Sequence, residues 1–279
     1  MRAKTENKKR IEMISVDKSK CIHCGNCIRD CVVEVLKTDS ENIPYLPPEL
    51  EKFCLNCQHC LAVCPTGAVT CNGVSAEQCI PVSPLPEPEK MLALLRQRRT
   101  VRFFKDENVS PEILAKLKEA LAWTPTGCND RSLMFKLVES KEEMLFYREE
   151  TSKMLKFLIK TGIMFLLYPR IKRFLSEILG GKDVIYRNAP HMLIVTVPDK
   201  APCKEADPWI AASYFDLLAQ SFGLGTCWCG FAVHAIKHNR KLKKHLNLPR
   251  GYKIAAVLLF GKPDVTYLRS TAPENFKFL

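Results

Sequence analysis

Eight cysteines in the first 64 residues form a repeat that restricts the fold more than any other feature of this sequence. Each half has the pattern C-x2-C-x2-C-x3-C, and the second half begins 33 residues after the first. The members are Cys21, Cys24, Cys27, Cys31, Cys54, Cys57, Cys60 and Cys64. Cysteines at this spacing bring three thiolates together on one tight loop, so this part of the chain has to fold around whatever the thiolates bind.

The spacing is that of cysteine runs that hold [4Fe–4S] clusters, in which the fourth cysteine of each run ligates the other cluster. The sequence therefore predicts one cluster on Cys21, Cys24, Cys27 and Cys64, and a second on Cys54, Cys57, Cys60 and Cys31. Structural zinc is the alternative, since four thiolates also suit zinc. Zinc ribbons, however, use two separated C-x2-C pairs. His23 and His59, inside the loops, are expected to face solvent.

A proline-rich stretch divides the chain. Residues 81–90, PVSPLPEPEK, contain four prolines, which disfavour helix and central strand and favour a semi-rigid spacer. Ten of the 14 cysteines precede this stretch. We expect a small cluster-binding domain at 1–80, a linker at 81–90 and a larger domain at 91–279.

Charge and cysteine content suggest a cytoplasmic protein. The first ten residues, MRAKTENKKR, lack the apolar core of a secretory leader, and cysteines without a leader are usually ligands or catalytic groups in a reducing compartment. The net charge of +12 lies after residue 80. Seven Lys and Arg between Lys237 and Lys253 suggest a solvated basic face, with an acidic redox protein as the alternative partner. No nucleic-acid-binding signature accompanies them.

The larger domain has the pattern of a mixed α/β fold. Helices are predicted at 89–99, 111–122, 208–222 and 231–246, with a further helical stretch over 141–180, and strands at 135–139, 191–197 and 254–260. The apolar run from Phe157 to Tyr168 is twelve residues long, whereas a membrane span needs about 20. Membrane contact is therefore not expected, although a helix on a membrane surface stays open.

Basic residues cluster after the first of these helices. Arg98, Arg99, Thr100 and Arg102 place three guanidiniums and a hydroxyl within five residues. Arginine binds phosphate through two parallel hydrogen bonds, so this segment is a candidate phosphate clamp, with a solvated surface as the alternative.

Both parts of the chain resemble known families. Residues 12–75 resemble a bacterial-type two-cluster ferredoxin, with Val32 after Cys31 where that family usually has proline. Residues 91–270 resemble the FMN-dependent nitroreductase family through the Arg98 segment and the turn PTGCN at 125–129, followed by the stretch GLGTCWCGF at 223–231 and the late Gly261-x-Pro263.

The nitroreductase resemblance implies an α+β sheet flanked by helices that binds FMN at the interface of a homodimer. It implies that the cofactor-binding residues are Arg98, Arg99, Thr100, Arg102, Pro125, Thr126, Asn129, Cys227, Trp228, Cys229, Gly230 and Arg269. No catalytic side chain is assigned, because the chemistry would be centred on the flavin. Arg131, where the family has glutamine, either faces an anionic substrate or reduced flavin, or points to solvent. Cys227 and Cys229 are expected to pack near the flavin as small apolar residues.

The combination suggests an oxidoreductase in which the clusters pass single electrons from a low-potential donor to FMN. Reduced flavin would then reduce a small electrophile, such as a nitro compound, a quinone or an activated alkene. Two alternatives remain open. The second domain could be a docking module of an electron carrier, or NAD(P)H could reduce the flavin directly.

Overall fold

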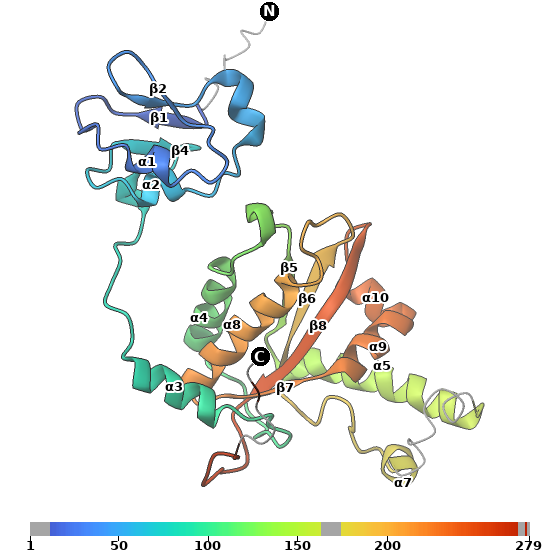
Figure 1. The fold of residues 1–279 in the computed structure, drawn as a ribbon. Helices are drawn as coiled ribbons and strands as arrows, with labels where there is room; N and C mark the ends of the chain where they lie inside the picture. Colours follow the sequence, from blue (N-terminus) through green and yellow to red (C-terminus); the bar gives the residue numbers. More distant parts are fainter. Residues whose placement is uncertain (1–11, 163–173, 273–276, 278–279) are drawn as a thin grey trace, which may run out of the picture. The chain divides into compact units, whose positions relative to one another are not determined.

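Figure 1 shows the computed structural model, which describes residues 12–162, 174–272 and 277. The contacts divide the chain into two units, Met1–Leu85 and Pro86–Leu279. Much of the apolar run predicted at 157–168 lies outside the described residues. Among the described residues, no helix is long and apolar enough to cross a membrane.

The first unit is built from short strands and two single-turn helices. Strand β1 (Ile14–Val16) pairs antiparallel with β4 (Val69–Cys71), and β2 (Lys37–Thr38) pairs with β3 (Pro44–Tyr45). Helices α1 (Asn26–Arg29) and α2 (His59–Ala62) each lie within one cysteine run, and 3-10 turns cover Pro48–Phe53 and Ala76–Gln78. Buried Ile14, Leu36, Leu61 and Val69 form the small core between them.

The backbone repeats with the same 33-residue displacement as the cysteines. Helices α1 and α2 begin 33 residues apart, and each follows a residue in the left-handed region, Gly25 with φ 69° and Gln58 with φ 62°. The absence of proline after Cys31 does not change the chain path. Glu34 N–H donates to the Cys31 carbonyl at 2.9 Å, as Gly67 N–H does to Cys64 at 3.3 Å. The departure at Val32 therefore leaves both loops with the same local turn.

The second unit contains a four-stranded antiparallel sheet with the order β5-β6-β8-β7. The strands are β5 (Met134–Val138), β6 (His191–Pro198), β7 (Gly225–Trp228) and β8 (Tyr252–Gly261). Strand β6 is buried along nearly its whole length because helices cover both faces. Alternate residues point to opposite sides of a strand. Leu193 and Val195 accordingly join one core, and Met192 and Ile194 join the other.

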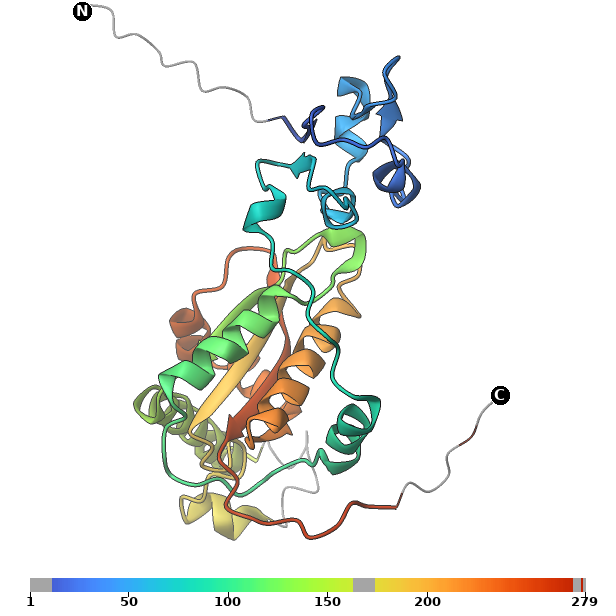
Figure 2. The same cartoon turned by 90° about the vertical axis from the view of Figure 1, so that its left-hand side faces the viewer.

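Helices cover both faces of the sheet. Helices α4 (Pro111–Ala122) and α8 (Asp207–Ser221) lie on one face, and α5 (Lys141–Lys160), α9 (Gly230–His238) and α10 (Arg240–Leu246) lie on the other (Figures 1 and 2). Helix α3 (Pro88–Gln97) contacts α8, and α7 (Leu175–Leu179) contacts α5. Ser110 caps α4 by accepting a hydrogen bond from Ile113 N–H, with Pro111 at the first helical position.

Most predicted elements are present, with three corrections. The helix predicted at 231–246 is two helices, because the Asn239 side chain accepts hydrogen bonds from the amides of Lys241 and Leu242 and starts a new helix. The helical stretch predicted over 141–180 is interrupted, since α5 ends at Lys160, followed by Gly162 with φ 78°. Strand β7 was not predicted.

Candidate functional site

The eight repeat cysteines line two separate cavities in the first unit. One cavity is lined by Cys21, Cys24, Cys27 and Cys64, together with apolar residues such as Val16 and Val69. The other is lined by Cys31, Cys54, Cys57 and Cys60. Each cavity thus combines three cysteines of one run with the fourth cysteine of the other run. This is the grouping that crossed cluster ligation requires.

Within the described ranges, no three His, Cys, Asp or Glu side chains come close enough together to hold a single metal ion. A zinc ion needs four ligand atoms at about 2.0–2.3 Å from one point. The crossed cysteine runs that line each cavity fit a [4Fe–4S] cluster, for which runs of this spacing are the usual ligands.

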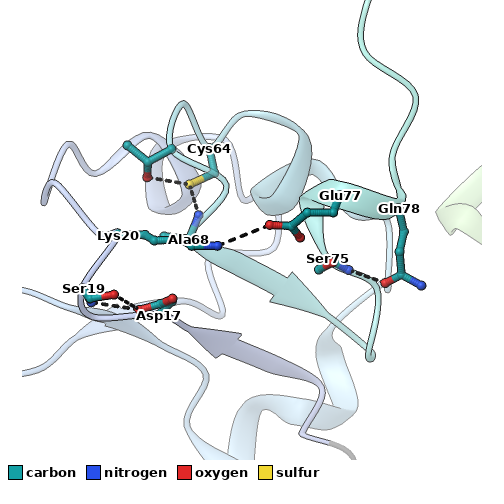
Figure 3. Close-up of polar contacts among 9 residues, drawn as sticks. Asp17, Ser19, Lys20, Cys64, Ala68, Ser75, Glu77 and Gln78 are labelled. Carbon is teal, nitrogen blue, oxygen red and sulfur yellow. Dashed lines mark hydrogen bonds and ion pairs between the residues drawn. The ribbon is translucent and has the colours of Figure 1, made fainter.

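Hydrogen bonds are directed at one of the sulfurs predicted to bind a cluster. The Cys64 Sγ accepts a bond from Ala68 N–H at 3.3 Å and lies 3.8 Å from the Thr66 hydroxyl (Figure 3). Burial acts to raise the pKa of Cys64, but these hydrogen bonds outweigh it and leave the pKa below the usual value. Such donors stabilise the thiolate that a metal centre needs.

The ends of the first unit are fastened by polar contacts close to this loop. Lys20, next to Cys21, forms an ion pair with Glu77 at 3.3 Å, and Ser75 N–H donates to the Gln78 side chain at 2.9 Å (Figure 3). Hydrogen bonding by Ser75, with help from Lys20, lowers the pKa of Glu77 to about 2. These contacts hold the last 3-10 turn against the first cysteine loop.

The loop histidines are exposed, as expected from the sequence. His59 lies 3.2 Å from the Asp30 carboxylate and also lines the second cavity. His23 is 3.4 Å from the Asn42 carbonyl.

In the second unit, the arginine-rich segment runs along strand β7. Val101 N–H donates to the Thr226 carbonyl at 2.8 Å, and Thr100 forms a parallel bridge with Thr226. Gly225 is required here, because a Cβ atom on it would lie 2.4 Å from a methyl group of Val101. The fold thus brings together the predicted phosphate clamp and the glycine stretch, which are more than 120 residues apart.

A buried carboxylate organises this junction. Asp216 of α8 is 3% exposed and accepts hydrogen bonds from the Thr226 hydroxyl and, at 3.0 Å, from the Trp228 indole. Arg98 lies 3.7 Å from the same carboxylate. Arg98 is therefore partly neutralised and held in place, whereas its neighbour Arg99 has no carboxylate partner among the described residues.

Two features of the segment fit an anionic flavin cofactor. Arg99 spends one nitrogen, Nη1, on the carbonyls of Arg96 and Arg98, but its buried Nη2 has no hydrogen-bond partner in the described part of the chain. Gly230 begins helix α9, and a Cβ atom on it would meet nothing within 4 Å. An unpartnered guanidinium nitrogen and an open glycine at a helix start suit a phosphate and a closely approaching ring.

The two cysteines near β7 are protonated packing groups. Burial raises the pKa of Cys227 against the opposing effect of Arg187 and Arg102, and burial raises the pKa of Cys229 to about 11. A thiol with a raised pKa is a weak nucleophile. This agrees with their predicted role in packing.

Arg187 is a basic residue at this site that sequence analysis missed. Its positive charge acts to lower the pKa of the Cys227 thiol, as does that of Arg102, and its backbone is in the left-handed region with φ 54°. No motif precedes it, so only the fold shows its position. The C-terminal segment also returns here, since the Tyr267 hydroxyl lies 3.5 Å from the Thr100 carbonyl, two residues before the predicted Arg269.

The turn at 125–129 occupies a different place. Gly127 N–H donates to both carboxylate oxygens of Asp207, at 3.1 and 3.2 Å, which fixes the turn at the start of α8. Arg131 folds back onto the turn, since its side chain donates to Asn129 Oδ1 at 3.0 Å and to the Ala122 carbonyl at 3.1 Å. Arg131 is exposed, and these two hydrogen bonds hold its side chain against the turn.

Comparisons with known proteins match both units. Residues 95–262 match the nitroreductase family, and residues 20–68 match the 4Fe-4S dicluster domain. An iodotyrosine deiodinase of Thermotoga neapolitana is 26% identical over 176 residues, which cover 61% of this chain and 87% of the deiodinase. An uncharacterized ferredoxin of Methanocaldococcus jannaschii is 40% identical over 57 residues, which cover 20% of this chain and 73% of the ferredoxin.

Solved structures show the same fold in the second unit. A nitroreductase with bound FMN from Desulfitobacterium hafniense has a TM-score of 0.54 at 24% identity, covering 68% of this chain and 98% of that one. A nitroreductase with bound FMN from Bacteroides fragilis has a TM-score of 0.51 at 19% identity, covering 68% of this chain and 98% of that one. The predicted α+β class is thereby confirmed.

These matches define a class of protein, an iron–sulfur flavin oxidoreductase in which a ferredoxin-like unit precedes an FMN-dependent one. The nitroreductase match covers more than half of the chain, so the chain belongs to the nitroreductase family. The predicted fusion of two-cluster ferredoxin and nitroreductase domains is confirmed.

Proposed function

We propose that this protein passes electrons from two [4Fe–4S] clusters to FMN, and that reduced flavin then reduces a small electrophilic substrate. The observation that carries the proposal is the pair of cavities, each lined by four repeat cysteines, in the same chain as a nitroreductase fold. Cys21, Cys24, Cys27 and Cys64 would hold one cluster, and Cys54, Cys57, Cys60 and Cys31 the other. The competing function, an electron carrier with a non-catalytic docking domain, leaves the second unit without a cofactor.

The second unit would hold FMN through the residues gathered along β7. Arg99 and Arg102 would bind the phosphate with Thr100 and Arg98, and Arg269 would approach from the C-terminal segment. The backbone from Cys227 to Gly230, which includes Trp228, would lie along the flavin ring. When bound, FMN takes up electrons one at a time and delivers two of them as a hydride, which the protein controls by orientation and exclusion of water.

The separation of the two flavin-binding segments supports a homodimer. The turn 125–129 is fixed at Asp207, and the arginine segment is fixed at Asp216, nine residues further along α8. At 1.5 Å per helical residue these anchors are about 13 Å apart. In a dimer, Pro125, Thr126 and Asn129 of one protomer would complete the flavin site of the other.

The substrate class follows from the flavin chemistry. Hydride or paired electron delivery suits nitro compounds, quinones and activated alkenes. The similarity to an iodotyrosine deiodinase adds iodinated phenols to this set of small electrophilic acceptors. A low-potential protein is the proposed donor, and the exposed basic residues of α9 and α10 suit an acidic one.

The order of reduction tests the route of electron entry. After anaerobic rapid mixing with reduced methyl viologen, we expect the cluster absorbance to bleach first and the flavin absorbance to follow. NADH alone should leave both cofactors oxidised over the same interval, because in the proposed route the flavin receives its electrons only from the clusters. Flavin that is reduced by NADH while the clusters remain oxidised would contradict the proposed route and favour direct reduction.

A further inference from the structure

The two cluster cavities differ by one sulfur atom. Cys71, the last residue of β4, is 1% exposed and lines the cavity formed by Cys31, Cys54, Cys57 and Cys60. The other cavity is lined by its four repeat cysteines and no fifth. The cysteine repeat does not include Cys71, so nothing in the ligand pattern accounts for it.

The β1–β4 ribbon explains the difference. Cys71 pairs with Ile14, and Val69 pairs with Val16. Residues two apart on a strand lie on the same face. One face of the ribbon therefore covers both cavities, with Val16 and Val69 at the first and Ile14 and Cys71 at the second.

The Cys71 side chain packs beside the cysteines of this cavity, Cys60 among them. Its S–H donates to Asn56 Oδ1 at 3.4 Å. When Cys60 binds iron it is a thiolate, which can only accept. A charged acceptor forms the stronger bond, so the single S–H proton of Cys71 would then point to Cys60.

Resting on the function proposed above, we propose that Cys71 is a hydrogen-bond donor that raises the reduction potential of the cluster held by Cys31, Cys54, Cys57 and Cys60. Reduction adds negative charge to a cluster, and hydrogen bonds to its sulfurs are among the factors that set its potential. The other cavity, which Val69 covers from the same face of the ribbon, lacks this donor. The two clusters are therefore unequal, and the first electron to arrive settles on the cluster beside Cys71.

A redox titration of the full-length holoprotein, followed by electron paramagnetic resonance, tests this assignment. In Cys71→Val, one of the two cluster couples should become about tenfold harder to reduce, which is 59 mV for one electron, while the other stays unchanged. Cys71→Ser keeps a donor and should keep the wild-type couple. Iron content should stay at about eight per chain in both variants.

The reciprocal variant is Val69→Cys, which places a thiol over the other cavity. It should raise the potential of the couple that Cys71→Val leaves unchanged. The proposal would be overturned if neither substitution changes the reduction potential of either cluster, or if both substitutions change the potential of the same cluster. Loss of iron in Cys71→Val and in Cys71→Ser would show instead that Cys71 is a ligand. A wild-type protein without iron contradicts the proposed function, whereas an eight-iron protein with unresponsive couples contradicts only this inference.

Discussion

The double variant Cys21→Ala/Cys64→Ala should retain about four iron atoms per chain, whereas Cys21→Ala/Cys31→Ala should lose both clusters. The first pair lines a single cavity, although 43 positions separate the two residues in the chain. The second pair belongs to one sequence run but lines two cavities. Iron and sulfide analysis of anaerobically purified protein measures the difference.

Controls separate ligand loss from damage to the fold. Cys79→Ala removes an exposed cysteine outside both cavities and should keep all the iron. Flavin content reports on the second unit in each variant and should stay unchanged. Retention of four iron atoms by the Cys21/Cys31 variant, with loss of all iron from the Cys21/Cys64 variant, would show that each run holds its own cluster.

Arg99→Gln should weaken FMN binding by about 10- to 100-fold. The Nη2 atom of Arg99 is buried without a partner in the described residues, so a phosphate oxygen could accept its unused hydrogen bond. A hydrogen bond to a charged group contributes about 1.5–3 kcal/mol, and each 1.4 kcal/mol changes the dissociation constant tenfold. Quenching of flavin fluorescence on titrating the apoprotein gives the constant.

Riboflavin provides the matched comparison for this variant. It has the same ring but no phosphate, so its affinity should be the same for wild type and Arg99→Gln. Arg96→Gln changes an exposed side chain in the last turn of α3 and should bind FMN like the wild type, because only the Arg96 carbonyl contacts Arg99. An equal loss of riboflavin and FMN affinity in Arg99→Gln would mean that Arg99 shapes the fold and does not bind phosphate.

The arrangement of the first unit was predictable because its cysteine ligands follow one another at a fixed, short spacing in the sequence. A tight loop with three cysteines fixes its own backbone, and the 33-residue repeat then reproduces Gly25 at Gln58 and Glu34 at Gly67, all with positive φ. Cys71 is not part of this repeat. Only the pairing of β4 with β1 shows that it faces the second cavity.

In the second unit the sequence motifs were predictable, but the way in which the fold brings them together was not. Strand β7 is only four residues long and begins with a glycine, Gly225, so its strand character comes from pairing with β8 and not from local propensity. Arg187 reaches Cys227 from a loop with no sequence signal. The helix break at Asn239 was within reach of sequence analysis, because asparagine is a preferred N-cap residue, but the apolar period runs on through it.

The measurement that tests the central claim most directly is an anaerobic absorption spectrum of the purified protein with iron and flavin quantified per chain. The account predicts about eight iron atoms and about one FMN. Eight iron atoms without flavin would contradict it and leave an electron carrier, and flavin with zinc in place of iron would mean that the cysteine repeat holds a different metal.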